Sequence, residues 1–312
     1  MCIICTTGIE QLNELTEIDC SCCANLVIIP TLKNLKKLTC YDCINLVKIE
    51  PMALRTLICS QCPNLTMISN FPMLEFLFCR RCILLTEIPT LNNLEVLICD
   101  YCENLTAINP QPKLMRLSCG GISGIILLPV FGQLKDLNCF RCISLISIPK
   151  CPELRELYCS GCENLVGIPV LNKLETLICK ECPNLRQISS MENLKELLCG
   201  KCPSLEKIAF QPKLVKLNAP DCPILTDITP NNIVGGFIVN DYKWLIYNQS
   251  YEQNLEALIR CQKVAKKIIR INRFTKLLRS TQFIEYYYAP NKRGGLQAKS
   301  QIAKFLSNIR VK

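Results

Sequence analysis

A pattern of 20 residues recurs along most of this 312-residue chain and constrains its fold more than any other feature. A representative unit, Leu94 to Lys113, has the sequence LEVLICDYCENLTAINPQPK. Its apolar positions follow the order L-x-x-L-x-C-x-x-C-x-x-L-x-x-I, and eleven units follow this order closely. A unit of this length cannot bury its own apolar side chains, so neighbouring units must stack to form a common core. The sequence therefore predicts a solenoid.

The pattern resembles the leucine-rich repeat, L-x-x-L-x-L-x-x-N/C-x-L, with cysteine in place of the third leucine. The segment Leu97-x-Cys99 alternates inward and outward positions, as a strand does, so successive units are expected to pair in parallel on a concave sheet. Prolines such as Pro89 and Pro110 recur in the returning segment, where they disfavour a helix. We expect eleven parallel strands and an extended convex side. In its short repeats the array is similar to bacterial leucine-rich effectors.

The repeat and the charge divide the chain into segments. We interpret residues 1–11 as a truncated first repeat, 12–230 as the leucine-rich-repeat array, 231–251 as a connector and 252–312 as a small basic helical tail. Residues 241–312 contain 15 Lys and Arg but only 4 Asp and Glu, so the excess positive charge lies in the last quarter of the chain. The segment Gly120 to Pro129, GGISGIILLP, lacks one cysteine of the pattern and is expected to form a local kink between two half-arrays.

The chain has 25 cysteines, and most of them fall into two rows at fixed positions of the repeat. Taken alone, Cys79-x2-Cys82-x16-Cys99-x2-Cys102 is a good zinc-site spacing. The repeat itself generates this spacing many times, however, at positions predicted to face inward, where a thiol acts as a small apolar group. We therefore predict buried, reduced and metal-free thiols, with disulfides between neighbouring rungs as the alternative. The cysteines outside the two rows, which are expected to be exposed, are Cys22, Cys151 and Cys261.

Composition argues against catalysis and against export. The chain has no histidine, the usual general base, and no catalytic residue or cofactor is predicted. The first residues, MCIICTTGIEQLNELTEIDC, lack the basic start and apolar run of a signal peptide, and no stretch is apolar enough to cross a membrane. The expected localisation is the cytoplasm, where thiols stay reduced.

Outward positions on the strands provide the predicted binding surface, because solenoids bind through such faces. Phe76, Phe78, Val96 and Ile98 would adjoin one another, with Arg80 at their edge. Exposed apolar and aromatic side chains beside arginine are typical of an interface hot spot. A preference of these residues for strands is the alternative explanation. The predicted partner-binding residues are Ile58, Phe76, Phe78, Arg80, Val96, Ile98, Tyr158, Ile178 and Leu198.

The C-terminal tail is predicted to contain a basic amphipathic helix between Glu252 and Ser280. Helices of this kind bind acidic surfaces such as anionic lipid or nucleic acid. The alternative is a cap whose apolar side covers the last repeat. The basic residues expected to face an acidic surface are Lys263, Lys266, Lys267, Arg270 and Arg273.

The end of the chain, STQFIEYYYAPNKRGGLQAKSQIAKFLSNI, resembles the tail of repeat proteins from amoeba-infecting giant viruses of the mimivirus type. The resemblance implies an interaction protein of the host-cell cytoplasm without an assigned activity. It is carried by Phe283, Glu285, Tyr286, Tyr287, Tyr288, Pro290, Gly294, Gly295 and Lys299.

These features support one leading function and two alternatives. The leading hypothesis is a non-enzymatic protein-binding scaffold that acts on an unidentified host protein. The first alternative is a nucleic-acid or membrane-surface adaptor acting through the basic tail. The second is a thiol or zinc enzyme, which the missing catalytic residues disfavour. Cys2 and Cys5 begin a unit without a polar cap, so an exposed strand edge is also expected there. Two explanations stay open: the protein self-associates at this edge, or a preceding piece is missing.

Overall fold

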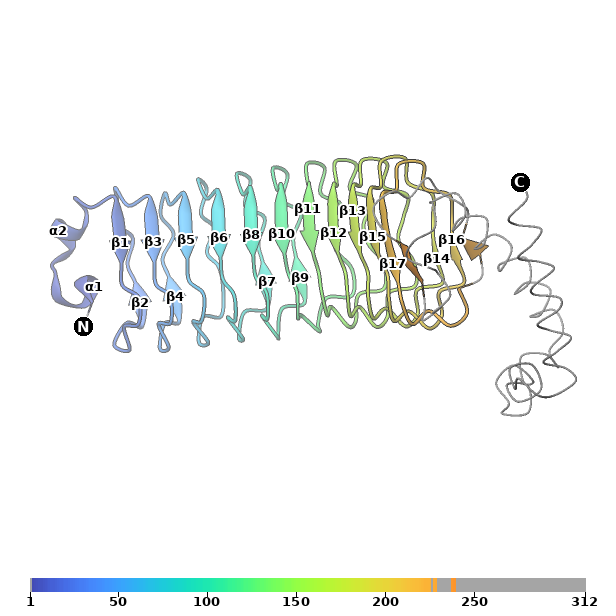
Figure 1. The fold of residues 1–312 in the computed structure, drawn as a ribbon. Coiled ribbons are helices and arrows are strands. Elements are labelled where there is room, and N and C mark those ends of the chain that lie inside the picture. Colours follow the sequence, from blue (N-terminus) through green and yellow to red (C-terminus); the bar gives the residue numbers. More distant parts are fainter. Residues whose placement is uncertain (1, 226, 229–236, 240–312) are drawn as a thin grey trace, which may run out of the picture. The chain divides into compact units, whose positions relative to one another are not determined.

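The computed structural model describes residues 2–225, 227–228 and 237–239. Its main element is a sheet of twelve parallel strands, which lie side by side in chain order (Figure 1). The strands are β1 (Glu17–Asp19), β3 (Lys37–Thr39), β5 (Thr56–Ile58), β6 (Phe76–Phe78), β8 (Val96–Ile98), β10 (Arg116–Ser118), β11 (Asp136–Asn138), β12 (Glu156–Tyr158), β13 (Thr176–Ile178), β15 (Glu196–Leu198), β17 (Lys216–Ala219) and β19 (Phe237–Val239).

The returning segments on the convex side are extended, as the prolines predict. Between residues 13 and 225 no segment is helical. Three small parallel sheets form there from two-residue strands. Their members are β2 (Ile28–Ile29) with β4 (Lys48–Ile49), β7 (Glu87–Ile88) with β9 (Ala107–Ile108), and β14 (Gln187–Ile188) with β16 (Lys207–Ile208) and β18 (Asp227–Ile228).

The register of the main sheet follows the sequence repeat. Leu117 pairs with Leu97 on one side and with Leu137 on the other, and all three leucines are fully buried. The eleven strands predicted from the repeats, β1 to β17, are confirmed. A twelfth strand, β19, pairs with β17 inside the segment interpreted as a connector, so parallel pairing continues beyond the last recognisable repeat.

The two rows of cysteines have different roles in the core. First-row thiols such as Cys59 and Cys79 follow the strands and are fully buried. Second-row thiols donate a hydrogen bond to a backbone carbonyl of the preceding repeat: Cys82 Sγ lies 3.1 Å from the carbonyl oxygen of Cys59. The same bond recurs at Cys43, Cys62, Cys102, Cys142, Cys162, Cys182, Cys202 and Cys222. The second row therefore satisfies backbone acceptors that burial would otherwise leave without a partner.

Cys151 corrects one of the sequence expectations, because it is buried and only 1% exposed. It lies on the convex side, 20 residues from Phe131 and from Leu171, which are also buried. Cys151 therefore occupies an inward position of the repeat that larger apolar residues fill elsewhere. Cys22 is exposed as expected, and Cys261 lies outside the described residues. All 24 cysteines of the described part are free thiols.

The segment Gly120 to Pro129 does not divide the array. Strand β10 pairs with both β8 and β11 in the same register as the other strands, so the expected kink between two half-arrays is wrong. The two glycines of this segment are explained by local contacts instead. A side chain at Gly120 would collide with the ring of Phe140, and one at Gly121 with the ring of Tyr101.

The start of the chain also differs from the expectation. Two short helices, α1 (Ile3–Thr6) and α2 (Ile9–Leu12), occupy the segment interpreted as a truncated repeat (Figure 1). Helix α2 buries Leu12, whereas no residue of α1 is buried. In the described part of the chain no helix is long and apolar enough to cross a membrane.

Candidate functional site

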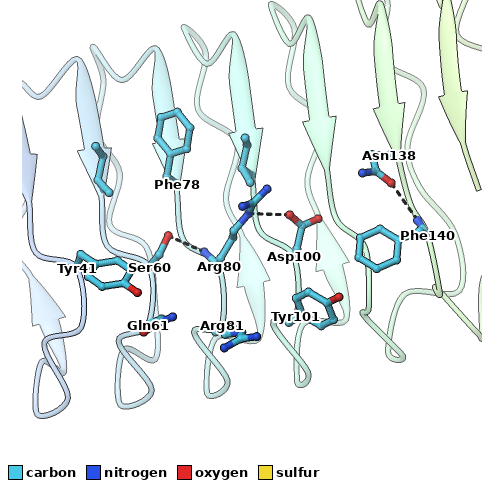
Figure 2. Close-up of a pocket in the computed structure, with 12 residues that line it drawn as sticks. Tyr41, Ser60, Gln61, Phe78, Arg80, Arg81, Asp100, Tyr101, Asn138 and Phe140 are labelled. Carbon is cyan, nitrogen blue, oxygen red and sulfur yellow. Dashed lines mark hydrogen bonds and ion pairs between the residues drawn. The ribbon is translucent and has the colours of Figure 1, made fainter.

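A hollow of about 620 Å³ lies where the concave sheet meets the loops that follow its strands (Figure 2). It extends over six consecutive strands, β3 to β11, and five of them, all except β10, provide its lining from the strand or from the residues just after it. The lining residues are Tyr41, Ile58, Ser60, Gln61, Phe78, Arg80, Arg81, Ile98, Asp100, Tyr101, Asn138 and Phe140.

The apolar part of the hollow is a row of three side chains on adjacent strands. Phe78 pairs with Ile58 on one side and with Ile98 on the other, and all three are half-buried. Phe76 and Val96 pair with each other on the same two strands but do not line the hollow. The sequence thus placed these five residues next to one another, and the structure adds that only three of them share a cavity.

Arg80 is held at the hollow by a buried carboxylate. Its Nε donates to Asp100 Oδ2 at 2.8 Å, and its backbone N–H donates to Ser60 Oγ at 3.1 Å (Figure 2). Asp100 is only 2% exposed, and its second oxygen accepts hydrogen bonds from Ser118 Oγ at 2.6 Å and from the backbone N–H of Gly120 at 2.8 Å. Burial without pairing would disfavour this charge, so the salt bridge and the two donors act together to hold it.

The Arg80 side chain is nevertheless 56% exposed, and its Nη groups take part in no hydrogen bond within the described residues. They remain available to an acceptor outside the protein. A guanidinium whose orientation is already set loses less side-chain freedom on binding than a free one.

An arginine and two aromatic rings line the loop side of the hollow. The guanidinium of Arg81 lies 5.7 Å from the ring centre of Tyr101, within cation–π range. The rings of Tyr101 and Phe140 meet edge to face, with centres 5.6 Å apart. These rings approach each other because Gly120 and Gly121 provide no side chain between them.

The local backbone explains why Arg81 and Tyr101 are exposed at this edge. The residue before each second cysteine adopts a left-handed conformation, with φ of 56° at Arg81 and 60° at Tyr101. A left-handed residue directs its side chain away from the course of the turn, and glycine takes the same position at residues 121 and 161. The sequence analysis missed Tyr101 as a site residue, although its fixed place before Cys102 was a usable signal.

Asp100 and Ser60 were also missed. Both follow a first-row cysteine, as Arg80 does, and they are 20 residues from Arg80 on either side. Opposite charges one repeat apart, at Arg80 and Asp100, were the available signal, since equivalent positions of neighbouring repeats are adjacent in the sheet.

The remaining predicted residues form a second group on the same sheet. Tyr158 pairs with Ile178, which pairs with Leu198, and Ser118 and Asn138 separate them from the row at Phe78. The hydroxyl of Tyr158 donates to Glu156 at 2.9 Å, and this bond raises the pKa of the phenol. The predicted basic residues Lys263, Lys266, Lys267, Arg270 and Arg273 lie outside the described residues.

Two solved structures illustrate what the chain is similar to. A leucine-rich repeat protein from Bacteroides ovatus is 17% identical, with a TM-score of 0.34, over 66% of this chain and 76% of its own. A leucine rich cell surface protein from Faecalibacterium prausnitzii is 15% identical, with a TM-score of 0.33, over 77% of this chain and 84% of its own. No family model matches the sequence, and no curated protein does.

The chain is a leucine-rich-repeat solenoid. This assignment follows from its own 20-residue register, the parallel pairing of equivalent residues and the inward leucines. Burial within this fold suppresses the ionisation of some of the thiols. Burial raises the pKa of Cys43 to about 11 and raises that of Cys99 well above its ordinary value, so both stay protonated and unreactive near neutral pH.

We predict that alkylation of the native, chelator-treated protein labels Cys22 and Cys5, which are exposed, and leaves the two buried rows unlabelled. The physical reason is that a reagent must reach the sulfur atom, and the thiols of the two rows are enclosed in the core. Mass spectrometry of peptides labelled before and after denaturation measures this directly. Extensive native labelling at Cys59 or Cys82 would contradict the proposed core.

Proposed function

We propose that this protein is a non-enzymatic scaffold that binds a protein partner through the hollow around Phe78. The observation that carries the proposal is the row Ile58, Phe78 and Ile98, half-exposed on the concave sheet beside an arginine whose orientation is set by a buried carboxylate. Folding requires the inward residues of these strands to be apolar. It does not require the outward residues to be apolar or cationic.

The size of the hollow favours a polypeptide over a small molecule. Its lining runs from Tyr41, after β3, to Phe140, after β11, which is five strand spacings. At about 4.8 Å per spacing this is roughly 24 Å, the length of a peptide segment of several residues. Aromatic residues and arginine, which line this length, are also the types that contribute most to protein interfaces.

The charges indicate the chemistry of the partner. Arg80 and Arg81 carry two positive charges, and Asp100 compensates one of them. The remaining charge, together with the apolar row, fits a segment that presents an apolar side chain next to a carboxylate. The resemblance of the C-terminal tail to giant-virus repeat proteins extends the proposal to a host protein as the partner.

The test uses the full chain with Phe78→Ser and Ile98→Ser combined. We expect partner binding to weaken by at least about thirtyfold, because truncating a hot spot costs about 2 kcal/mol or more. The melting temperature should stay close to that of the parent, since both side chains face outward. Affinity purification from amoeba extract identifies the partner, and titration with that purified partner gives the ratio of dissociation constants.

A matched control removes apolar surface on the convex side. Val166 and Val170 are 58% and 51% exposed, and changing both to Ser should leave binding unchanged. A third variant, Lys266→Gln with Arg270→Gln, separates the tail from the array. If this tail variant loses the partner while the Phe78 variant retains it, the scaffold proposal is wrong and an adaptor acting through the tail replaces it.

A further inference from the structure

Three thiols meet at the amino-terminal end of the array. Cys2 precedes α1, Cys5 lies within it, and Cys23 belongs to the turn after β1. The sulfur of Cys5 lies 3.6 Å from that of Cys2 and 3.7 Å from that of Cys23, and all three sulfurs lie within 4.8 Å of one another. Among the described residues this is the one group of three potential metal ligands that converge in this way.

A single helical turn brings the first two sulfurs together. The backbone N–H of Cys5 donates to the carbonyl oxygen of Cys2 at 2.9 Å, and the Thr6 hydroxyl donates to the same oxygen at 3.2 Å. The C-x-x-C segment is therefore already folded, with both thiols directed toward Cys23.

Cys23 differs from every other second-row cysteine in what surrounds it. The nine others donate to the carbonyl of a first-row residue 22 or 23 positions earlier in the chain. Within the described residues Cys23 has no such first-row carbonyl bond, and its thiol contacts Cys5 instead. Its row position thus accounts for its burial, while its thiol faces the thiols of Cys2 and Cys5 and the backbone N–H groups of Cys2 and Asn25.

The sulfur separations match those of a thiolate-bound ion. Zn–S bonds of about 2.3 Å at tetrahedral angles place sulfurs about 3.8 Å apart. Thiolates are also the ligands that select zinc among common divalent cations in cells. The site is accessible, because Cys5 is exposed and Cys2 is half-buried, whereas the thiols of the two rows are enclosed in the core.

We propose that Cys2, Cys5 and Cys23 together bind one Zn²⁺ ion that fastens α1 to the first repeat. The three thiols release three protons to solvent, each sulfur donates a lone pair to the ion, and no electron is transferred. A water molecule completes the fourth position. Helix α1 buries no side chain of its own, so the ion supplies an attachment that apolar packing does not. The sequence analysis expected all cysteines to be metal-free. The proposal changes that expectation for Cys2, Cys5 and Cys23 and keeps it for the other cysteines.

The experiment titrates the reduced, chelator-treated full chain with Co²⁺, which reports thiolate ligation through its charge-transfer and tetrahedral d–d absorption. We expect one equivalent to bind and Zn²⁺ to displace it. Cys5→Ser should weaken binding by about 100-fold, because the free energy of a thiolate zinc site is shared among few ligands. Cys5 is exposed, so this variant should melt like the metal-free parent.

Cys22→Ser is the matched control, since Cys22 is exposed and adjacent to Cys23 but lies outside the group. It should keep full affinity and stoichiometry. Protection of Cys2 and Cys5 from alkylation by one equivalent of Zn²⁺ is a second readout. The proposal is overturned if no Co²⁺ thiolate spectrum appears, if the spectrum survives in Cys5→Ser, or if Cys22→Ser abolishes it equally.

Discussion

Raising the pH to about 9.5 should strongly destabilise the array. Eight first-row thiols are fully buried, and for each of them contact with a neighbouring thiol, loss of hydration or both raise the pKa well above the ordinary value. They are Cys40, Cys59, Cys79, Cys99, Cys119, Cys139, Cys159 and Cys179.

The direction of the effect follows from proton linkage. In the unfolded chain these thiols ionise with a pKa of about 8.5, whereas in the folded state they stay protonated. Their contribution to stability is therefore complete below about pH 8.5 and is lost as the pH rises above it. Each thiol costs about 1.4 kcal/mol at about pH 9.5, and eight cost about 11 kcal/mol, against a typical total stability of about 5–15 kcal/mol.

Second-row thiols offset part of this effect. The contact with Cys40 lowers the pKa of Cys62, so one thiol of such a pair can ionise in the folded state. A pKa that is lower in the folded state than in the unfolded state contributes stability that is retained at high pH, so the net loss is smaller than the sum over the eight first-row thiols. Urea unfolding followed by circular dichroism under reducing conditions, at several pH values between 7 and 10, measures the slope.

A replacement of one cysteine in a single repeat provides the control. Cys79→Val removes one buried thiol and should reduce the pH slope by about one eighth, whereas Cys22→Ser, at an exposed thiol, should not change it. A stability that stays constant up to about pH 10 would show that the thiols are not enclosed as described.

Leu137→Ala should destabilise the array by about 2–5 kcal/mol, the second largest effect that we expect. Leu137 is fully buried on β11 and pairs with Leu117 and Leu157, so truncating its side chain leaves a cavity between neighbouring repeats. In a solenoid each repeat contacts only its neighbours, so a central defect also weakens the coupling between the two sides. Urea unfolding at neutral pH measures both the midpoint and the cooperativity.

The neighbouring position supplies the comparison. Asp136 precedes Leu137 on the same strand, faces outward, and pairs with Arg116 at 3.0 Å on the surface. Asp136→Ala should cost less than about 1 kcal/mol, because exposed ion pairs contribute little. Equal losses in the two variants would mean that the inward and outward positions have been exchanged.

The sequence by itself determined the parts of this protein that the repeat specifies. The strands, their parallel register, the inward leucines and the extended convex side all follow from a 20-residue period in which side chains alternate between two faces. The same alternation placed Phe78 beside Ile58 and Ile98. These expectations succeeded because eleven copies of one pattern leave little freedom in assigning a face to each residue.

Only the tertiary structure decided the features that depend on departures from the pattern. The burial of Asp100 beside Arg80 depends on donors from Ser118 and Gly120 in the next repeat, and the edge-to-face contact of Tyr101 depends on glycines in that same repeat. The meeting of Cys5 with Cys23 depends on how α1 folds before the first strand. A period defines which face a residue occupies, but these contacts depend on turn conformations and side-chain directions in neighbouring repeats, and those are settled only when the chain packs.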